Sequence, residues 1–369
     1  MKKIGQLTFH ASHNYGSVLQ AYALSRQLQI MGYNTEFINL RPQSQKDAYR
    51  IIRESDRGIH RIFRYLIYPV LKRRYDNYER FINHILPITA QEYTSTDELV
   101  NANLDYDIYV CGGDQIWNPI CQDFETAYYL QFLNKNNEAR KIAYAPSLGR
   151  TEFDPIILNN IKNWLKKFDS ISVRERQGAE IIQKLTDKKV YTVCDPVILL
   201  GKKEWEKILI RPKYKKPYIL AYFLENNHGS RNLIDYLKKI TGYDVVIFNE
   251  YIRDFLKPYH KAYSASPEEF VGLFMNASFI YTNSFHGTVF ATIFEKPFLT
   301  AIAVDQKHAV NNNDSRKIDY LKKIGLEERL YTEGTPAKES LFCIDYTEAR
   351  KKIERFREDS LRYLEDAIS

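Results

Sequence analysis

The first 40 residues alternate between short apolar stretches and one long amphipathic stretch, and this pattern restricts the fold more than any other feature. Residues 3–8 predict a strand, residues 16–31 a helix with its apolar side chains near one face, and residues 35–40 a second strand. Two strands joined through a helix run parallel, because the helix returns the chain to the same end of the sheet. The chain therefore begins as an α/β protein.

The same alternation continues through the first half of the chain. Residues 107–111, 141–145, 170–173 and 189–194 each predict a strand, and the segments between them have helical spacing. A mostly parallel sheet is the economical interpretation. We therefore predict a Rossmann-like domain over residues 1–200.

The strand and helix pattern restarts after Pro217. Residues 218–224 and 244–249 predict strands on either side of a helix at 231–240. Ser266-Pro267-Glu268-Glu269 then has the form of a capping box with proline at the first helical position, which predicts a helix ending near Asn276. A second Rossmann-like domain is the natural result.

The length of 369 residues also fits two domains of about 150–200 residues each. We predict that residues 201–345 form the second domain and face the first across a cleft. A charged helix over residues 346–369 has apolar positions that pack back on the first domain. The predicted fold class is α/β, with two Rossmann-like domains.

The composition excludes several classes of protein. With 44% hydrophobic and 27% charged residues the chain is globular, and no run approaches the roughly 20 apolar residues of a membrane span. Its start, MKKIGQLTFH, lacks the apolar region of a secretory signal, so we expect a cytoplasmic protein. The four cysteines form no C-x-x-C pair, which argues against a zinc site or a disulfide framework. A net charge of +7 without any nucleic-acid-binding motif does not favour nucleic acid as a partner.

Residues 50–81 form a basic segment with nine basic and four acidic side chains, and its apolar residues have helical spacing. One interpretation is an amphipathic helix that contacts an anionic membrane surface or receives a lipid-linked acceptor. The other is a helix packed on the first domain with a solvated basic face. The sequence favours the second interpretation.

The loop between the first strand and the first helix is the first candidate site. It contains Asn14, Tyr15, Gly16 and Ser17, and so combines a glycine, small polar groups and a helix N-terminus. Such a loop can receive a phosphate or a sugar hydroxyl. The alternative is a capped turn in which Asn14 or Ser17 only satisfies helix N–H groups.

The second candidate follows the strand at residues 107–111. Gly112 and Gly113 would let the backbone approach a ligand closely, and Asp114 then stands where a general base or an acceptor-orienting carboxylate would lie. A tight strand exit with Trp117 filling the core explains the same residues.

The third candidate is Arg174, at the carboxyl end of the strand over residues 170–173, with Arg176 nearby. The arginine fork suits a carboxylate or a phosphate. Pairing with Glu175 or Glu180 is the alternative.

The fourth candidate is the turn after the apolar residues 278–282, where Ser284, His286, Gly287 and Thr288 precede an apolar helix. Ligands of open α/β sheets collect where strands end and helices begin, and a histidine there can supply a proton or a charge. Further on, His308 and the run Asn311-Asn312-Asn313-Asp314-Ser315-Arg316 predict either a flap with Arg316 as an anion ligand or a solvated loop.

Five short motifs together resemble those of the polysaccharide pyruvyl transferase family. They are His13-Asn14-Tyr15-Gly16, Gly112-Gly113-Asp114-Gln115-Ile116-Trp117-Asn118, Ser172-Val173-Arg174-Glu175, Asp195-Pro196-Val197 and Ser284-Phe285-His286-Gly287. The resemblance runs in order from about residue 4 to residue 330. It implies a GT-B-like fold and the transfer of a pyruvyl group from phosphoenolpyruvate to two hydroxyls of a sugar, as a cyclic ketal.

The resemblance also implies roles for single residues. His286 would protonate the methylene carbon of phosphoenolpyruvate, Arg174 would hold the donor carboxylate or phosphate, and Asp114 would orient or deprotonate the acceptor. Neither a metal nor another cofactor is expected. Many family members carry arginine where this chain has Ser284. Arg316 or Arg176 would replace that cation, or Ser284 and the N–H groups of Gly287 and Thr288 would bind the phosphate.

Two other functions stay open at this point. A GT-B-type glycosyltransferase would use the second-domain turn to hold the pyrophosphate of a nucleotide sugar. A non-catalytic sugar- or membrane-binding subunit of a polysaccharide assembly complex would rely on residues 50–81. The leading prediction is a cytoplasmic pyruvyl transferase that acts on a nucleotide-linked or lipid-linked sugar during surface-polysaccharide assembly. Peripheral contact with the inner face of the membrane through residues 50–81 stays open.

Overall fold

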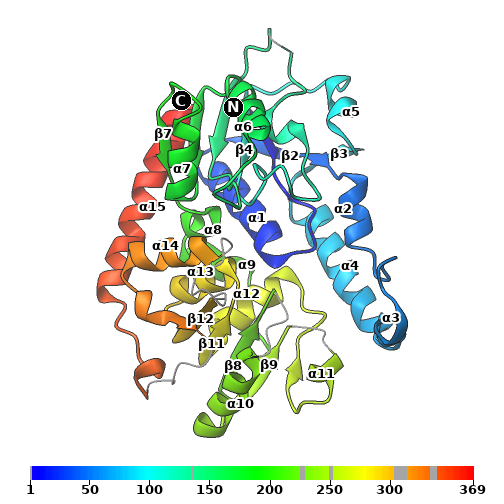
Figure 1. Ribbon diagram of the computed structural model, residues 1–369, viewed down its shortest axis with the longest axis vertical. Helices are drawn as coiled ribbons and strands as arrows, with labels where there is room; N and C mark the ends of the chain where they lie inside the picture. Colours follow the sequence, from blue (N-terminus) through cyan, green and yellow to red (C-terminus); the bar gives the residue numbers. More distant parts are fainter. Residues whose placement is uncertain (1, 135, 225–228, 249–251, 303–313, 333–338) are drawn as a thin grey trace. The chain divides into compact units, whose positions relative to one another are not determined.

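The computed structural model describes residues 2–134, 136–224, 229–248, 252–302, 314–332 and 339–369 (Figure 1). The chain divides into two compact units. Unit 1 comprises Met1–Arg53, Glu79–Leu200 and Glu354–Ser369, and unit 2 comprises Glu54–Tyr78 and Gly201–Ile353. The chain therefore passes into unit 2 twice before it ends in unit 1.

Unit 1 contains a seven-stranded parallel sheet with the order β3-β2-β1-β4-β5-β6-β7. The strands are β1 Lys3–Leu7, β2 Asn34–Leu40, β3 Ile88–Tyr93, β4 Ile108–Gly112, β5 Arg140–Tyr144, β6 Ser170–Val173 and β7 Val190–Thr192. Ile4 of β1 pairs with Thr35 on one side and with Ile108 on the other. The strand order reverses between β1 and β4, which is the switch point where open α/β sheets bind ligands.

The helices of unit 1 cover this sheet. They are α1 Tyr15–Ile30, α2 Gln43–Ala48, α5 Thr96–Val100, α6 Pro155–Leu165, α7 Arg176–Gln183, α8 Pro196–Leu200 and the ends of α4 Tyr68–His84 and α15 Thr347–Ile368. The predicted helix at residues 16–31 and the strands on either side of it are confirmed. Aromatic residues fill the core beside β4, where the ring of Trp117 stacks on Tyr129 at 4.8 Å.

Unit 2 contains a six-stranded parallel sheet with the order β10-β9-β8-β11-β12-β13. The strands are β8 Tyr218–Tyr222, β9 Asp244–Ile247, β10 His260–Lys261, β11 Phe279–Thr282, β12 Phe298–Ile302 and β13 Leu330–Thr332. Its helices are α3 Gly58–Leu66, α9 Lys202–Ile208, α10 Gly229–Thr241, α11 Ile252–Phe255, α12 Pro267–Asn276, α13 Phe285–Ile293 and α14 Ser315–Ile324. The order reverses between β8 and β11, so this unit has its own switch point.

The predicted capping box of α12 is present in both directions. The hydroxyl of Ser266 accepts a hydrogen bond from the backbone N–H of Glu269 at 3.2 Å, and the Glu269 carboxylate accepts one from the N–H of Ser266 at 2.8 Å. Two N–H groups that the helix leaves unpaired are thus satisfied, and α12 leads directly toward β11.

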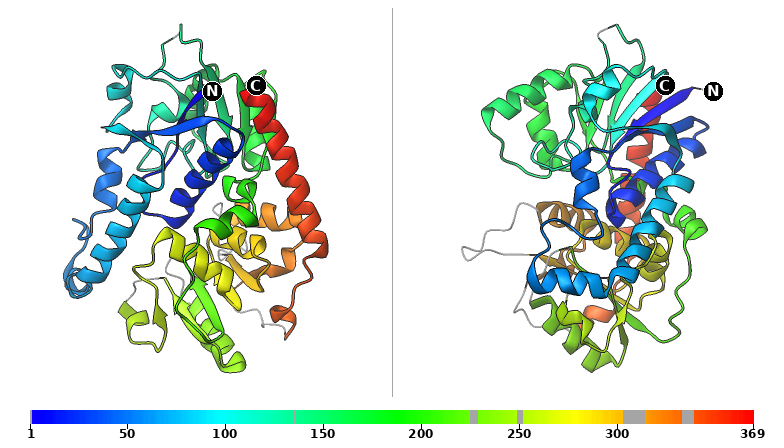
Figure 2. Two further views of the ribbon diagram at one scale, coloured as in Figure 1. Left: turned by 180° about the vertical axis from the view of Figure 1, so that it is seen from behind. Right: turned by 90° about the vertical axis from the view of Figure 1, so that its right-hand side faces the viewer.

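Residues Glu354–Ser369, which include most of α15, belong to unit 1. The Tyr363 hydroxyl donates to the carbonyl of Ala143 in β5 at 3.0 Å, and the backbone N–H of Cys194 donates to the Ser360 hydroxyl at 2.8 Å. The two ends of the chain lie near each other (Figure 2). The Lys2 ammonium donates to the Ser369 carbonyl at 3.1 Å. The sheet of unit 1 therefore depends on residues from both ends of the chain.

The basic segment differs from the prediction in two ways. It forms two helices instead of one. Pro69, at the start of α4, has no backbone N–H to donate to the carbonyl four residues earlier, so α3 cannot continue through it. Residues 54–78 also group with unit 2 rather than with the N-terminal domain. The ring of Phe63 lies 5.8 Å from that of Phe255, and the Asn77 amide donates to the Ser264 carbonyl at 2.7 Å. These contacts attach the segment to unit 2.

Candidate active site

The turn between β11 and α13 is held by its own polar side chains. The hydroxyl of Thr282 donates to the carbonyl of Tyr222 in β8 at 2.6 Å and accepts from the N–H of Ser284 at 3.0 Å. Ser284 is the N-cap of α13, and its hydroxyl accepts from the N–H of Gly287 at 3.3 Å. A Cβ on Gly287 would stand 2.5 Å from the Thr282 hydroxyl oxygen. Glycine therefore lets the helix begin directly against the strand.

His286 is the second residue of α13 and follows one of the two strands at the switch point of unit 2. It is buried, with 7% of its surface exposed, and its ring meets the ring of Phe285 edge-on at 5.3 Å. The imidazole is thus fixed by packing at the N-terminus of a helix, where the helix dipole favours an anionic group. His286 thus lies at a strand-to-helix turn, the local structure that its sequence predicts.

The N–H groups of Gly287 and Thr288 are used within the turn. Gly287 donates to the Ser284 hydroxyl, and Thr288 donates to the Ser284 carbonyl at 2.9 Å. The Thr288 hydroxyl also donates to that carbonyl at 2.9 Å and lies 2.9 Å from the Thr300 hydroxyl. These groups shape the turn, and a phosphate would have to displace a cap hydrogen bond to reach them.

Two cations from α14 lie at the same turn. The guanidinium of Arg316 is 6.0 Å from the centre of the Phe285 ring. The Lys317 ammonium donates to the carbonyls of Asn283 and Ala301, both at 2.8 Å, and pairs with Asp314. Sequence reasoning identified Arg316 but missed Lys317, whose only signal is its position beside Arg316. His308 and residues 311–313 lie outside the described part of the chain.

In unit 1, the loops after β1 and β4 meet at the switch point. The hydroxyl of Ser17 donates to one carboxylate oxygen of Asp114, and the N–H of Gln115 donates to the other at 2.8 Å. Asn14 is the N-cap of α1, and its side chain accepts from the N–H of Gly16 at 2.8 Å and from that of Ser17 at 3.4 Å. The capped turn described as an alternative is therefore present, and it also brings Ser17 to Asp114.

The two glycines at the end of β4, Gly112 and Gly113, are required by packing. A Cβ on Gly112 would stand 1.9 Å from the carbonyl oxygen of Tyr144, and one on Gly113 would stand 1.6 Å from the amide oxygen of Gln20. Gly113 has a φ of 69° and Asp114 a φ of 46°, so the chain turns through two left-handed residues. Asp114, which is 8% exposed, is held in this turn with a conformation that is rare for a residue with a side chain.

Arg174 lies in an internal ion-pair network. Its guanidinium contacts Asp195 at 2.6 Å and Glu175 at 3.0 Å. Burial opposes the charged guanidinium, but the negative charges of Glu175, Asp195 and Asp114 outweigh it and raise the pKa of Arg174 above its usual value. Arg174 is therefore a fixed cation in the electrostatic field of Asp114. The sequence pointed to Asp195 only as part of a motif and did not predict that it pairs with Arg174. The neighbouring Arg176 is 75% exposed and 3.8 Å from Glu180.

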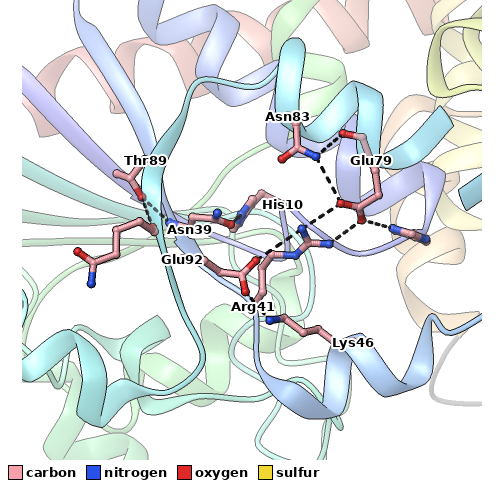
Figure 3. A network of polar contacts seen from close by, with 10 residues as sticks. His10, Asn39, Arg41, Lys46, Glu79, Asn83, Thr89 and Glu92 are labelled. Atoms are coloured by element: carbon pink, nitrogen blue, oxygen red, sulfur yellow. Dashed lines mark hydrogen bonds and ion pairs between the residues drawn. The ribbon is translucent and has the colours of Figure 1, made fainter. Parts of the chain in front are cut away.

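A second polar network in unit 1 was not predicted (Figure 3). Arg41 contacts the two carboxylate oxygens of Glu79 at 3.1 and 2.6 Å, and the imidazole of His13 lies 2.8 Å from the same carboxylate. Burial raises the pKa of Glu79, but the hydrogen bonds and charges of His13 and Arg41 dominate and lower it to about 2. Arg41 directly follows β2 and His13 follows β1, so adjacent strands deliver both groups to one edge.

His10 belongs to the same region but has a different character. Its ring nitrogens lie 3.2 Å from the Thr8 carbonyl and 3.1 Å from the Asn39 amide oxygen. Complete burial lowers the pKa of His10 to about 4, against the opposing effect of these two partners. His10 is therefore neutral at physiological pH and serves to connect β1 with β2.

The described residues lack two features that would bear on function. No group of three or more His, Cys, Asp or Glu side chains among them is arranged to hold a metal ion. No helix in these parts of the chain combines the length and apolar character that crossing a membrane requires.

Several solved structures are similar to the chain at low sequence identity. S. aureus MnaA with UDP matches 98% of this chain and 91% of its own at 13% identity, with a TM-score of 0.50. The UDP-GlcNAc 2-epimerase of Methanocaldococcus jannaschii, with UDP-GlcNAc and UDP, matches 97% of this chain and 92% of its own at 12% identity, with a TM-score of 0.48. E. coli heptosyltransferase WaaC, with ADP-2-deoxy-2-fluoro heptose, matches 97% of this chain and 99% of its own at 11% identity, with a TM-score of 0.40. The two parallel sheets and the first of these likenesses confirm the predicted α/β, GT-B-like fold class.

The sequence itself identifies the family. No curated protein matches the chain. The family model for polysaccharide pyruvyl transferase matches residues 14–306, which is more than half of the chain and includes His286, Asp114 and Arg174. The chain therefore belongs to the polysaccharide pyruvyl transferase family and is a transferase.

Proposed function

We propose that this chain transfers the pyruvyl group of phosphoenolpyruvate to two hydroxyls of a sugar in a surface-polysaccharide precursor, forming a cyclic ketal. Family membership supports the reaction class. The observation that carries the assignment of a residue is the position of His286, which is buried in the first turn of α13 at the switch point of unit 2. A proton donor beside a helix N-terminus suits a donor substrate that is anionic and needs protonation at carbon.

The proposed reaction balances with the two substrates and one acid. His286 gives a proton to the methylene carbon of phosphoenolpyruvate while a sugar hydroxyl oxygen bonds to the neighbouring carbon. The second hydroxyl oxygen then displaces phosphate from that carbon and closes the ketal. One hydroxyl proton returns to His286, and the other leaves with the phosphate. Every proton and electron pair is accounted for, so we propose that no metal or other cofactor takes part.

Arg316 is the cation that we propose for donor binding. The arginine that many family members carry is replaced here by Ser284, and the Arg316 guanidinium lies against Phe285, the residue between Ser284 and His286. A guanidinium at this place can bind the carboxylate or phosphate of the donor through paired hydrogen bonds. Arg174 already contacts the carboxylates of Glu175 and Asp195, so we propose Arg316 ahead of Arg174 as the cation that binds the donor.

We propose that Asp114 orients the acceptor sugar in unit 1. Ser17 and the Gln115 N–H hold its carboxylate at the switch point, where a sugar hydroxyl can donate to it. The acceptor would be linked to a nucleotide or a lipid. Phosphoenolpyruvate is a cytoplasmic metabolite, so the proposal also implies a cytoplasmic reaction.

Donor binding can be tested before the acceptor is identified. Thermal unfolding of the purified chain is measured with phosphoenolpyruvate, with phosphate and with UDP-sugars, because a ligand at 100 times its Kd stabilises the folded state by about 2.7 kcal/mol. We expect phosphoenolpyruvate to raise the Tm in the parent chain and Arg316→Ala to abolish the rise. Stabilisation by UDP-sugars alone would favour the glycosyltransferase alternative and refute the donor assignment.

Turnover is then measured by phosphate release and by NMR detection of the ketal methyl group with a panel of sugar acceptors. His286→Ala should lower kcat at least about 100-fold, the usual contribution of general acid catalysis. His84→Ala, at an exposed position on α4, is the matched control and should leave kcat unchanged. Equal rates for the two variants would remove His286 from the mechanism. Absence of turnover with every donor would favour a non-catalytic subunit.

A further inference from the structure

The helix α3 has a stripe of large apolar side chains on its outer face. Ile59, Ile62 and Leu66 are 67%, 62% and 76% exposed, although isoleucine and leucine are usually buried. Their spacing of three and four residues places them on one side of the helix. Phe63, on the neighbouring side, contacts unit 2. The outer stripe is therefore separate from the surface that attaches α3 to its unit.

Further exposed apolar residues lie at the end of α3, at the start of α4, and in the segment whose Phe255 contacts α3. Phe255, whose ring contacts Phe63 at 5.8 Å, is 50% exposed, and the following Leu256 is 85% exposed. Tyr65 and Tyr68 are 56% and 40% exposed, and Val70 is 37% exposed. Large apolar residues that stay exposed in one region mark an interaction site in folded proteins. We call this set, Ile59, Ile62, Tyr65, Leu66, Tyr68, Val70, Phe255 and Leu256, the α3 patch.

Basic side chains accompany the α3 patch. Arg57, Arg61 and Arg73 are exposed, and residues 54–78 contain six basic and three acidic side chains. Their chemistry complements an anionic surface, and long arginine side chains can reach past apolar groups to phosphates. Tyrosine prefers the boundary between water and hydrocarbon, which suits Tyr65 and Tyr68.

We propose that the α3 patch binds the surface of a bilayer that contains anionic phospholipids. Ile59, Ile62, Leu66 and Leu256 would enter the boundary between headgroups and acyl chains, and Arg57, Arg61 and Arg73 would contact lipid phosphates. With nine residues, α3 is about 14 Å long, less than half of the roughly 30 Å hydrocarbon core, so it lies in the membrane plane. The inference goes beyond the proposed reaction, and it places the enzyme where a lipid-linked acceptor would be found.

The test uses the full chain and vesicle flotation at about 0.15 M salt. Vesicles of phosphatidylcholine with phosphatidylglycerol should carry the protein, and vesicles of phosphatidylcholine alone should not. Ile62→Asp with Leu66→Asp should abolish flotation. Arg57→Glu with Arg61→Glu should weaken it at least about 25-fold, because each basic residue near an anionic surface contributes about fivefold.

Matched controls distinguish binding through the α3 patch from nonspecific adsorption to vesicles. Ile156 of α6 in unit 1 is 72% exposed, so Ile156→Asp repeats the apolar change elsewhere. Lys213 and Lys216 are exposed, and Lys213→Glu with Lys216→Glu repeats the charge change. Both controls should float like the parent chain. Each variant should also keep the parent Tm within about 2 °C, which shows that it is folded.

Three results would overturn the proposal. They are equal binding to neutral vesicles, no binding to anionic vesicles, and flotation that survives both α3 variants. A dimer that dissociates on Leu66→Asp while the parent chain does not float would assign the α3 patch to a second copy of the chain instead. Flotation requires neither phosphoenolpyruvate nor turnover, so its failure is distinct from failure of the proposed reaction.

Discussion

Glu79 should make unit 1 sensitive to acid, and the size of the effect follows from its contacts. The carboxylate, 20% exposed, accepts hydrogen bonds from Arg41 and His13, and its pKa falls from 4.5 to about 2. At ~1.4 kcal/mol for each tenfold change in proton affinity, the ionised Glu79 stabilises the folded state by about 3 kcal/mol. Since its folded pKa is the lower one, this stability is present above about pH 4.5 and is lost as the pH falls toward 2.

The perturbation is Glu79→Gln, which removes the charge and keeps the shape. At pH 7 the variant should lose about 3 kcal/mol of unfolding free energy relative to the parent chain, and at about pH 3.5 the difference should narrow to about 2 kcal/mol. The narrowing arises because the parent chain itself begins to lose the contribution of the ionised carboxylate. A stability difference that depends on pH in this direction is the signature of the network in Figure 3.

The assay must report on unit 1 alone. The chain has three tryptophans, and Trp205 is the one in unit 2, so Trp205→Phe leaves only Trp117 and Trp164 to report by fluorescence during urea unfolding. Glu92→Gln is the control, because Glu92 is 36% exposed, lies 3.8 Å from Arg41 and should cost under about 1 kcal/mol. An equal Glu79→Gln penalty at both pH values, or an equal penalty for the two variants, would refute the reasoning.

Three further predictions concern stability and binding. Gly113→Ala should destabilise unit 1 by at least about 2 kcal/mol, since its Cβ would clash with the Gln20 amide, and Gln20→Ala should restore part of the loss in urea unfolding; full tolerance would contradict the close approach. Ser17→Ala removes a donor to Asp114 and should raise KM for the sugar more than it lowers kcat, whereas a pure loss of kcat would argue for a role in the chemical step. Ser266→Ala should lower the stability of unit 2 by about 1 kcal/mol in thermal unfolding, and no change would mean that the capping box contributes little.

The sequence predicts the central strands well and the edges poorly. Residues 3–8 and 35–40 form buried strands whose continuous apolar character is visible in the sequence. Ile88–Tyr93 was not predicted, because this edge strand has only one buried residue and therefore no apolar pattern. The edge strand His260–Lys261 was not predicted either, because both of its residues are exposed. Periodicity reports burial, so it cannot identify a strand that water covers.

The candidate site shows a similar division between local and distant information. A helix cap at Asn14 and the turn at His286 follow from neighbours in the chain, and both were identified from the sequence. The pairing of Arg174 with Asp195 was not predicted, because these residues are 21 positions apart and are brought together only by the ends of β6 and β7. The contact of Glu79 with Arg41 likewise depends on the return of α4 to unit 1.

The discontinuity of unit 1 has a consequence for how the protein is made. During translation the ribosome releases residues 1–200 long before Ser360 and Tyr363, yet these two residues bond to the backbone of Cys194 and Ala143. Residues 1–200 contain all seven strands, but the part of unit 1 that α15 contacts stays uncovered until the whole of unit 2 has been synthesised. We expect a fragment that stops after residue 200 to aggregate. A chaperone that covers the surface that α15 later contacts should improve the yield of the complete chain.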